Sequence, residues 1–274
     1  MTPDAINAAA EILAGLRLHS GSGATQLDEL SPGCRPQSLD DAYAIQARAR
    51  EFLQARGAGT ACGWKIGCTT PVMQQYLNIP HPCAGTLYSA SVHAHSATLD
   101  KAVFFRLGLE CELAVRLGDD LPARSGGHDR TTVAPYVESI MASIEIIDHR
   151  FADLDSVSTA SLVADDFFSC GCVTGGEVSL QSIGDPALLT GGFSIDAAPA
   201  PETGKGEAIL GHPLTALAWL ADHLAAHGAR LSRGQIVTLG SVVKTFYPSA
   251  GMQVKAVFDA LEPATVNIVG SASG

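Results

Sequence analysis

The 274-residue sequence has no uninterrupted apolar run long enough to cross a membrane and no cluster of basic residues. A bilayer-spanning helix needs about 20 consecutive apolar residues, and the N-terminus lacks the basic region and cleavage site of a signal peptide. We therefore expect no membrane association and a cytoplasmic location. The net charge of −11, without a basic patch interleaved with aromatic residues, argues against nucleic acid binding.

The sequence also has few charged residues, at 16%, and no Cys-x-x-Cys pair among its seven cysteines. An odd number of scattered cysteines does not suggest a disulfide framework or a zinc site, so we expect most of them to be small buried side chains. The hydrophobic share of 46% predicts a compact chain with a large core, and part of the apolar surface is expected in the subunit contacts of a homo-oligomer.

Two helices are predicted before residue 60, and strand patterns dominate after it. Apolar residues recur at helical spacing over residues 3–17, and Ser38-Leu-Asp-Asp41 resembles an N-cap that opens a second helix ending near Gly57. Later helices are expected at 71–77, at 132–139 and from His212-Pro213 to Gly228. The fold class is therefore α+β: an N-terminal helical segment, residues 1–60, and a mixed β-sheet roll with peripheral helices, residues 61–274.

The stretch 106–117 places two carboxylates on one face of a predicted strand. Its apolar residues alternate with Glu110 and Glu112, so these two side chains point the same way and lie roughly 7 Å apart. Further along, Glu145 interrupts a second apolar run. Three carboxylates on strands could form a site for a hard divalent ion such as Mg²⁺ or Mn²⁺. Spacing alone favours the simpler interpretation, in which a two-faced strand keeps its charges in water.

Lys65 lies in the short β-like run 63–67, where its side chain points away from those of Trp64 and Ile66. The pattern alone favours an exposed strand residue. The alternative is a lysine beside the carboxylates, where its ammonium holds an anionic substrate or relays a proton.

Other polar residues stand at the ends of predicted strands. Asp148 and His149 follow the Glu145 strand and are either partners of the site or the solvated end of the strand. Asp165 and Asp166 precede an apolar run, a position more typical of a turn or a cap.

The order and spacing of these motifs carry more information than any one of them. The chain contains Gly-Trp-Lys-Ile-Gly at 63–67, Gly-Thr-Leu at 85–87, Glu-Cys-Glu at 110–112, Ile-Glu-Ile-Ile at 144–147, Val-Ala-Asp-Asp at 163–166, Leu-Gly-His-Pro at 210–213 and Gly-Ser at 240–241. From about residue 38 to 270 it resembles the fumarylacetoacetate hydrolase superfamily. The resemblance is greatest to the bacterial branch of 2-keto-4-pentenoate hydratases and 4-oxalocrotonate decarboxylases.

This resemblance implies a mixed β-roll that holds Mg²⁺ or Mn²⁺ on Glu110, Glu112 and Glu145. The substrates of the family are small 2-keto or 2-hydroxy-dienoate acids from aromatic catabolism. A hard cation can bind the carboxylate and the adjacent keto or enolate oxygen of such an acid together, and it then stabilises the enolate.

The resemblance also assigns roles to residues that do not bind the metal. Lys65 matches the family's active-site lysine, which stabilises the substrate carboxylate or carries a proton. The bend at Gly240 and Ser241 is expected to present backbone N–H groups to the substrate. Asp165 is expected to support the site from outside the set of metal ligands.

The predicted reaction is the metal-dependent addition of water to a 2-hydroxy-2,4-dienoate, through ketonisation of the dienol and attack of water on the distal alkene. The nearest alternative is a decarboxylase of a 2-keto dicarboxylate. A carbon–carbon hydrolase of an acylpyruvate would need a histidine base that the sequence does not locate. A non-catalytic subunit that associates with a pathway hydratase or decarboxylase remains the alternative from another class.

Three positions depart from residues common in this branch. Cys83 stands where many hydratases have a loop aspartate, Leu239 stands where threonine is common, and Gly108 stands where a basic residue is common. Loss of the loop carboxylate favours the decarboxylase. Lys244, just past the bend, is either a contact for a second substrate carboxylate or a solvated side chain.

Overall fold

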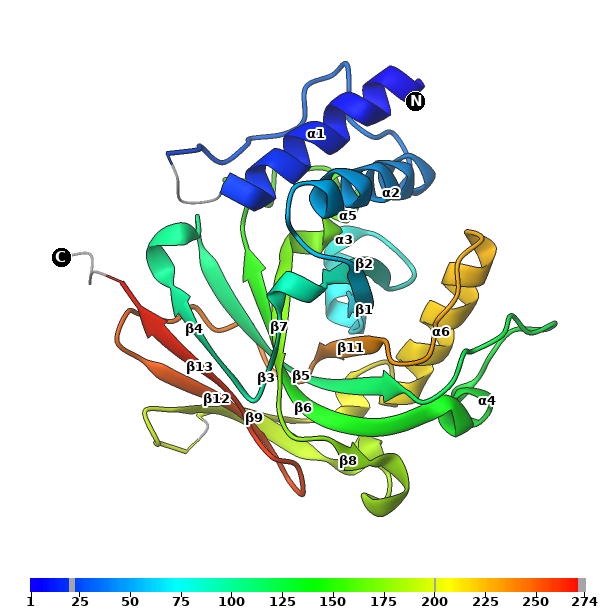
Figure 1. The fold of residues 1–274 in the computed structure, drawn as a ribbon, viewed down its shortest axis with the longest axis vertical. Coiled ribbons are helices and arrows are strands. Elements are labelled where there is room, and N and C mark those ends of the chain that lie inside the picture. The colour runs from blue at the N-terminus through cyan, green and yellow to red at the C-terminus, as the bar shows by residue number, and fades with distance from the viewer. Residues whose placement is uncertain (20–22, 200, 271–274) are drawn as a thin grey trace.

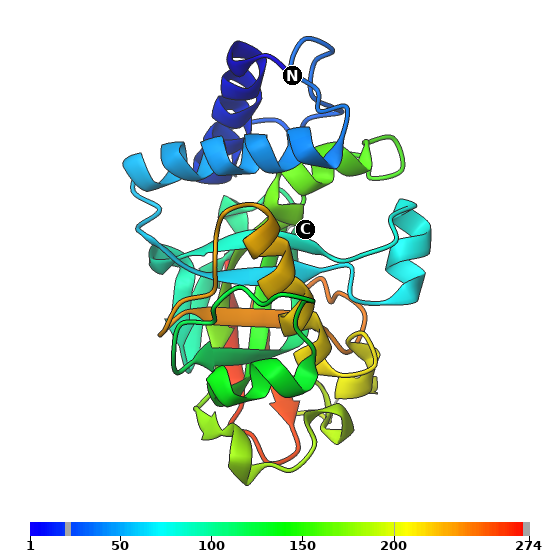
Figure 2. The same ribbon diagram turned by 90° about the vertical axis from the view of Figure 1, so that its right-hand side faces the viewer.

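The computed structural model describes residues 1–19, 23–199 and 201–270. Two β-sheets form the body of the protein, and two helices, α1 (Pro3–His19) and α2 (Leu39–Ala55), lie across one end of it (Figure 1). The view in Figure 2 shows the same two helices outside the sheets. The α+β class, with mixed sheets and peripheral helices, is confirmed.

The N-terminal helices begin close to where the sequence predicts them. The Ser38 hydroxyl accepts the Asp41 N–H and caps α2, which ends at Ala55. Buried apolar residues of both helices form one cluster with residues of the segment 147–168. This cluster ties the helices to the rest of the chain, and the division at residue 60 stays a prediction.

The larger sheet has eight strands in the order β2-β1-β11-β5-β6-β7-β3, with β8 paired to β6. Its strands are β1 (Ala61–Gly67), β2 (Cys83–Tyr88), β3 (Val92–Ala94), β5 (Leu107–Leu117), β6 (Val137–Asp148), β7 (Ser169–Thr174), β8 (Val178–Ser179) and β11 (Ile236–Ser241).

The smaller sheet has five strands in the order β10-β9-β12-β13-β4. These strands are β4 (Ser96–Asp100), β9 (Thr190–Ile195), β10 (Thr203–Lys205), β12 (Gln253–Phe258) and β13 (Ala264–Val269). One large hydrophobic cluster contains side chains from both sheets, so the two sheets share a core.

The antiparallel pair β5 and β6 sets the position of the glutamates. Glu110 lies opposite Glu145 in the register, and Glu112 lies opposite Ser143. The sequence suggested that the polar face of β5 is in water, but Glu112 is 1% exposed and Glu145 is 0% exposed. The solvated interpretation is therefore wrong for these two side chains, because Glu145 is buried beside Lys65 of β1 and Glu112 is buried beside Gly240 of β11.

Strand β1 carries Lys65 and lies between β2 and β11 in the larger sheet. It pairs in parallel with β11 and antiparallel with β2, so that Lys65 lies between Thr238 and Gly85. Gly63 permits this approach, since a Cβ there would lie 2.0 Å from the carbonyl oxygen of Ile236. Lys65 is 2% exposed, so its prediction as an exposed strand residue is wrong.

The remaining helices border the sheets: α3 (Pro71–Leu77), α4 (Arg130–Val133), α5 (Thr159–Ala164) and α6 (Pro213–Ala226). The helix α6 is capped by His212 Nδ1, which accepts the Leu214 N–H. This agrees with the start predicted at His212-Pro213. The helix predicted over 132–139 is wrong in extent. A 3₁₀ turn follows α4, and β6 begins at Val137, because Pro135 lacks the N–H that a longer helix would use.

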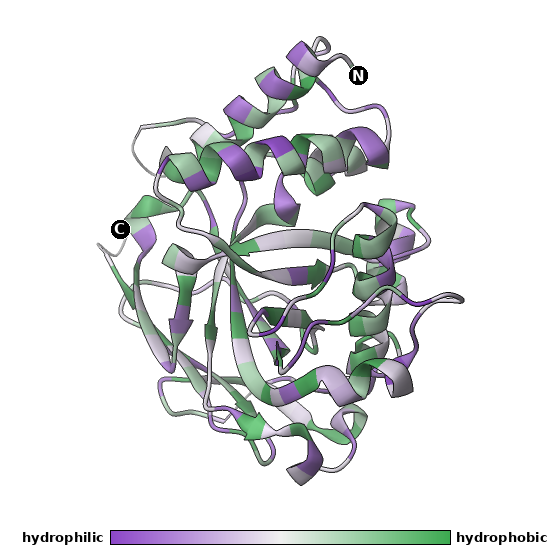
Figure 3. Ribbon diagram, turned by 45° about the vertical axis from the view of Figure 1, so that its right-hand side comes forward, coloured by the Kyte–Doolittle hydropathy of each residue, from purple (hydrophilic) through white to green (hydrophobic). Residues whose placement is uncertain are grey.

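Apolar residues gather along α6 and the strands, whereas α1 and α2 alternate between polar and apolar bands (Figure 3). This pattern matches helices that bury one face and expose the other. Within the described residues, no helix combines the length and the apolar character that crossing a membrane requires.

Candidate metal and substrate site

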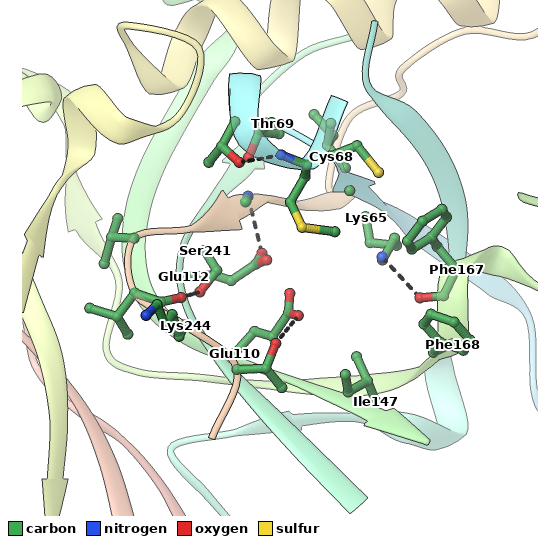
Figure 4. Close-up of a pocket in the computed structure, with 18 of the residues that line it drawn as sticks. Lys65, Cys68, Thr69, Glu110, Glu112, Ile147, Phe167, Phe168, Ser241 and Lys244 are labelled. Carbon is green, nitrogen blue, oxygen red and sulfur yellow. Dashed lines mark hydrogen bonds between the residues drawn. The ribbon is translucent and has the colours of Figure 1, made fainter. Parts of the chain in front are cut away.

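Three carboxylates converge on one point beside the β5–β6 pair. Glu110, Glu112 and Glu145 each offer a carboxylate oxygen, and these oxygens lie within 4.8 Å of one another. Glu110 and Glu112 extend from one face of β5, and Glu145 extends from the position on β6 that faces Glu110. Figure 4 shows Glu110 and Glu112 directed into the same cavity as Lys65.

Three oxygens of these carboxylates lack the hydrogen-bond partners that buried oxygens normally have. Among the described residues, Oε1 of Glu112 and both oxygens of Glu145 are buried without such a partner. Three ionised carboxylates beside the single ammonium of Lys65 would leave two uncompensated negative charges. Mg²⁺ prefers oxygen ligands at about 2.0–2.1 Å, so a hard divalent ion fits both the charge and the spacing of this set.

Lys65 faces the carboxylates from β1. Its Nζ lies 3.4 Å from Oε1 of Glu145, and it donates a hydrogen bond of 3.4 Å to the carbonyl oxygen of Phe167. Burial alone would lower the pKa of Lys65, but the carboxylates, Glu145 first, raise it above its usual range. Lys65 is therefore an ammonium ion at neutral pH.

The pKa values of two of the glutamates are raised by their burial and by the neighbouring carboxylates. Burial, followed by the charges of Glu145 and Glu110, raises the pKa of Glu112 well above its usual value. Burial also raises the pKa of Glu145 to about 7, although Lys65 acts in the opposite direction. In the absence of a cation, the site therefore retains protons near neutral pH.

We expect the affinity for Mn²⁺ to fall as the pH is lowered through about 7, because the ion must displace protons from Glu145 and Glu112. Both pKa values are raised, so the carboxylate forms are populated at higher pH and lost as the pH falls. Calorimetric titrations at pH 6 and 8, in two buffers of different ionisation enthalpy, measure the protons released. We expect about one proton or more at pH 6, and equal affinities without proton release would contradict the site.

The end of β11 and the residues after it orient the two glutamates of β5. The Gly240 N–H donates to Oε2 of Glu112 at 3.2 Å, and the Thr245 hydroxyl donates to Oε1 of Glu110 at 2.8 Å. Gly240 has a φ of +125°, and a Cβ there would lie 2.2 Å from the hydroxyl oxygen of Thr69. The bend therefore needs glycine.

Gly240 and Ser241, which the family resemblance assigns to a substrate-binding bend, both line the cavity. The Gly240 N–H, however, is directed at Glu112, and the Ser241 hydroxyl donates to the Val243 carbonyl oxygen at 2.7 Å. A direct contact between this bend and a substrate stays a prediction.

A cavity of about 590 Å³ extends from the glutamates, and its volume suits a small organic acid. Lys65, Lys244 and Glu202 are among its charged residues. Most of the remaining wall is apolar and includes Val72, Met73, Ile147, Leu154, Phe167 and Phe168. The cavity thus combines charged groups, which suit a carboxylate, with an apolar wall, which suits a hydrocarbon chain.

His149 and Tyr247 form a hydrogen-bonded pair in the wall of this cavity. His149 Nε2 and the Tyr247 hydroxyl are 2.9 Å apart, and the imidazole stacks on Phe168. Burial, followed by the charge of Arg106, lowers the pKa of His149 to about 4, so the imidazole is neutral at neutral pH. His149 is 4% exposed, so of the two alternatives left open by the sequence, the solvated strand end is wrong for it.

Tyr247 is a residue that sequence reasoning missed. It lies after the last site motif, in a segment without strand or helix periodicity, and the Arg106 guanidinium lies 4.2 Å from the centre of its ring. The isolated bridge between Leu109 and Phe246 brings this segment back beside β5. A long-range pairing of this kind leaves no local mark in the sequence.

Asp165 lies against Arg150. The fully buried Arg150 guanidinium donates to both carboxylate oxygens of Asp165 at 2.7 and 2.9 Å. Burial raises the pKa of Asp165 to about 6, although Arg150 acts to lower it. A supporting role for Asp165 stays a prediction, since the hydrogen-bond acceptor of Lys65 is the carbonyl oxygen of Phe167, two residues later.

Cys83 is 1% exposed and packs in the apolar cluster shared with the N-terminal helices. It is not among the described residues that line the cavity. The thiol therefore stands apart from the polar groups of the site and does not substitute for a carboxylate base.

No protein-family model matches the sequence. The chain is 30% identical over 236 residues to a 2-keto-4-pentenoate hydratase from Burkholderia vietnamiensis, covering 86% of this chain and 88% of that protein. It is 30% identical over 251 residues to a 2-hydroxyhexa-2,4-dienoate hydratase from Comamonas testosteroni, covering 90% and 93%. It is 26% identical over 230 residues to a 4-oxalocrotonate decarboxylase from Pseudomonas putida, covering 84% and 85%.

Two solved structures illustrate the fold. The 4-oxalocrotonate decarboxylase from Pseudomonas putida G7, complexed with magnesium and adipate, matches with a TM-score of 0.89 at 23% identity, covering 98% of this chain and 99% of that one. A fumarylpyruvate hydrolase from Pseudomonas aeruginosa, in complex with Mn²⁺ and pyruvate, matches with a TM-score of 0.59 at 13% identity, covering 77% and 90%. Divalent ions thus accompany both of these structures.

Proposed function

This chain belongs to the family of 2-keto-4-pentenoate hydratases and 4-oxalocrotonate decarboxylases within the fumarylacetoacetate hydrolase superfamily, and from that membership we propose that it adds water to a 2-hydroxy-2,4-dienoate. It is an enzyme of the lyase type, like these hydratases and decarboxylases. The observation that carries the proposal is the set of three converging glutamates, with unpartnered buried oxygens, beside a buried ammonium in a cavity.

Glu110, Glu112 and Glu145 would hold Mg²⁺ or Mn²⁺, which when bound would draw in the substrate's carboxylate and 2-oxygen and stabilise negative charge on that oxygen. Lys65 supplies a fixed positive charge on the same side of the cavity. Because its pKa is raised, it serves as a cation and a hydrogen-bond donor rather than as a base. The Gly240 N–H and the Thr245 hydroxyl keep two of the glutamates oriented.

Hydration requires proton transfers far from the substrate carboxylate. The dienol loses its 2-hydroxyl proton and gains a proton at C5, and water then adds its oxygen at C4 and a proton at C3. His149 continues the face of β6 that carries Glu145 and Ile147. His149 and Tyr247 line the same cavity as Glu110 and Glu112, and we place them beside the distal part of a substrate anchored at the glutamates.

We assign the His149–Tyr247 pair to the proton of the attacking water. The water passes its proton to the Tyr247 oxygen as the phenolic proton moves to Nε2 of the neutral His149. The same pair can return the proton to the substrate. This relay does not need the loop carboxylate whose position Cys83 occupies.

Tyr247→Phe is expected to lower kcat by about 100-fold, the low end of what a positioned acid–base group contributes. The substitution keeps the ring that packs under Arg106 and removes only the hydroxyl that meets His149. Steady-state kinetics measure the effect, and Mn²⁺ affinity serves as the control that should not change. An unaltered kcat would remove Tyr247 from the mechanism.

A second candidate function is decarboxylation of a 2-keto dicarboxylate. The buried position of Cys83, outside the cavity wall, leaves the loop without the carboxylate common in hydratases, and this favours the decarboxylase. The same cation-stabilised charge on the 2-oxygen would serve loss of carbon dioxide.

Product analysis separates the two candidates. Purified protein with Mg²⁺ is incubated with 2-hydroxypenta-2,4-dienoate and, separately, with 2-keto-hexenedioate. Formation of 4-hydroxy-2-ketovalerate from the first supports the hydratase. Release of carbon dioxide from the second, with no product from the first, would replace it with the decarboxylase.

The same proposal includes Mg²⁺ or Mn²⁺ as the bound ion and a cytoplasmic location. It also includes a symmetric homo-oligomer and association with a pathway hydratase or decarboxylase. The hydrophobic share of 46% supports subunit contacts. Light scattering of the purified protein tests the oligomer.

A further inference from the structure

Three consecutive residues beside the site have left-handed backbone conformations without being glycine. Asp166, Phe167 and Phe168 have φ values of 52°, 52° and 67°. In this region the Cβ of an ordinary residue crowds the following carbonyl oxygen, so single residues are uncommon there and three in succession need external support. The segment 166–168, called here the left-handed turn, is therefore held in place by contacts with its surroundings.

The left-handed turn determines where the acceptor for Lys65 lies. The carbonyl oxygen of Phe167 accepts the hydrogen bond from Lys65 Nζ, and the Phe167 ring centre lies 5.6 Å from the same nitrogen. Phe167 and Phe168 also line the cavity. If the turn relaxed to ordinary backbone angles, the ammonium would lose this acceptor and the cavity would lose part of its wall.

The side chain of Asp166 anchors the turn at two points. Its Oδ1 accepts the Thr86 N–H of β2 at 3.1 Å, and its Oδ2 accepts a hydrogen bond from Arg17 Nη1 at 2.7 Å. Both side chains of the Arg17–Asp166 ion pair are 8% exposed, so the pair is shielded from solvent and salt. The Arg17 guanidinium also lies 4.9 Å from the centre of the Tyr88 ring.

Arg17 belongs to α1, and no residue of α1 or α2 is among the described residues that line the cavity. We propose that Arg17 is a positioning residue for Lys65: through Asp166 it holds the left-handed turn, and the turn holds the carbonyl oxygen that fixes the ammonium. The N-terminal helix is thereby part of the catalytic apparatus without touching the substrate. This inference rests on the proposed function only where it concerns turnover.

The test compares Arg17→Met with Arg56→Met in the full-length protein. Arg56 offers a matched control, because it also forms an ion pair of 2.8 Å, but with Glu11 of α1, away from the turn, and with both side chains more exposed than those of the Arg17 pair. We expect Arg17→Met to lower kcat about 10-fold with KM and Mn²⁺ affinity nearly unchanged. Arg56→Met should leave all three quantities unchanged.

A second readout follows Lys65 itself and needs no turnover. Modification of lysines by trinitrobenzenesulfonate, followed by peptide mass spectrometry, gives the reaction rate of each side chain. The reagent arylates the free amine, and both the hydrogen bond to the Phe167 carbonyl oxygen and the wall formed by Phe167 and Phe168 protect Lys65 from it. We therefore expect Lys65 to react several-fold faster in Arg17→Met than in wild type, and other lysines to react at the wild-type rate. A purely structural role for Arg17 would raise lysine reactivity generally or leave Lys65 unchanged.

Asp166→Asn gives an independent variant in case Arg17→Met folds poorly. Its amide oxygen can still accept the Thr86 N–H, but it loses the charge that pairs with Arg17. The proposal predicts the same faster modification of Lys65 in this variant. Wild-type Lys65 reactivity in both variants, or equal effects of the Arg17 and Arg56 substitutions, would overturn it. Failure of wild-type protein to turn over a dienoate would instead overturn the proposed function and leave the labelling result valid.

Discussion

Lys65→Ala is expected to lower kcat by about 100- to 1,000-fold, the loss seen when one preorganised donor is removed from a site of developing charge. Lys65 is buried, remains an ammonium because the carboxylates raise its pKa, and lies 3.4 Å from Glu145. Lys65 is the one charged residue of β1, so no other side chain of that strand can replace its positive charge. Steady-state kinetics with saturating Mg²⁺ measure the change.

The affinity for Mn²⁺ should be unchanged or higher in Lys65→Ala, because a positive charge beside the ion has been removed. A lower kcat with unchanged Mn²⁺ affinity distinguishes a lysine that acts in catalysis from one that only maintains the structure of the site. Lys255→Ala, on β12 of the other sheet, is the control and should behave as wild type. Unchanged kinetics in Lys65→Ala would refute the assigned role.

Glu145→Ala and the nearly isosteric Glu145→Gln are expected to abolish activity and to weaken Mn²⁺ binding by more than about 100-fold, the upper range for changes outside the direct ligands. Glu145 is fully buried, and neither of its oxygens has a hydrogen-bond partner among the described residues. The glutamine keeps the volume of the side chain, so the fold should persist. Calorimetry measures the metal affinity, and circular dichroism checks the fold.

Glu138 provides the matched control, because it lies on the same strand β6 but on an exposed position. Glu138→Gln should keep both metal affinity and activity. The same loss of metal binding is expected for Glu110→Ala, whose carboxylate completes the set. Retention of full activity by Glu145→Ala or Glu110→Ala would eliminate the three-glutamate site.

Much of the local structure follows from the sequence. Alternation predicted strands around Glu110 and Glu145, and the Ser38 and His212 caps marked the starts of α2 and α6. The burial of the glutamates could not be predicted from the sequence, because period-two alternation shows that a strand has two faces but not whether the polar face is exposed to solvent. The buried glutamates contact Lys65 of β1 and Gly240 of β11, two strands that are distant in sequence and pair in parallel.

The site was located by the order of its motifs rather than by the chemistry of any one residue. The register that sets Glu110 opposite Glu145 depends on how β5 and β6 align, and many alignments are compatible with the alternation alone. The contacts of Arg17 with Asp166, and of His149 with Tyr247, join segments that no periodicity connects. The left-handed turn is also unmarked, because its residues are not the glycines that usually signal positive φ.

The most direct measurement is the ultraviolet absorbance of freshly generated 2-hydroxypenta-2,4-dienoate in the presence of the purified protein. The decay is recorded without added metal, with Mg²⁺, and again after excess chelator. We predict rapid loss of the dienol signal only with Mg²⁺, formation of 4-hydroxy-2-ketovalerate, and return to the spontaneous rate after chelation. A decay that never exceeds the spontaneous rate, or one that the chelator does not affect, would contradict a metal-dependent hydratase built on Glu110, Glu112 and Glu145.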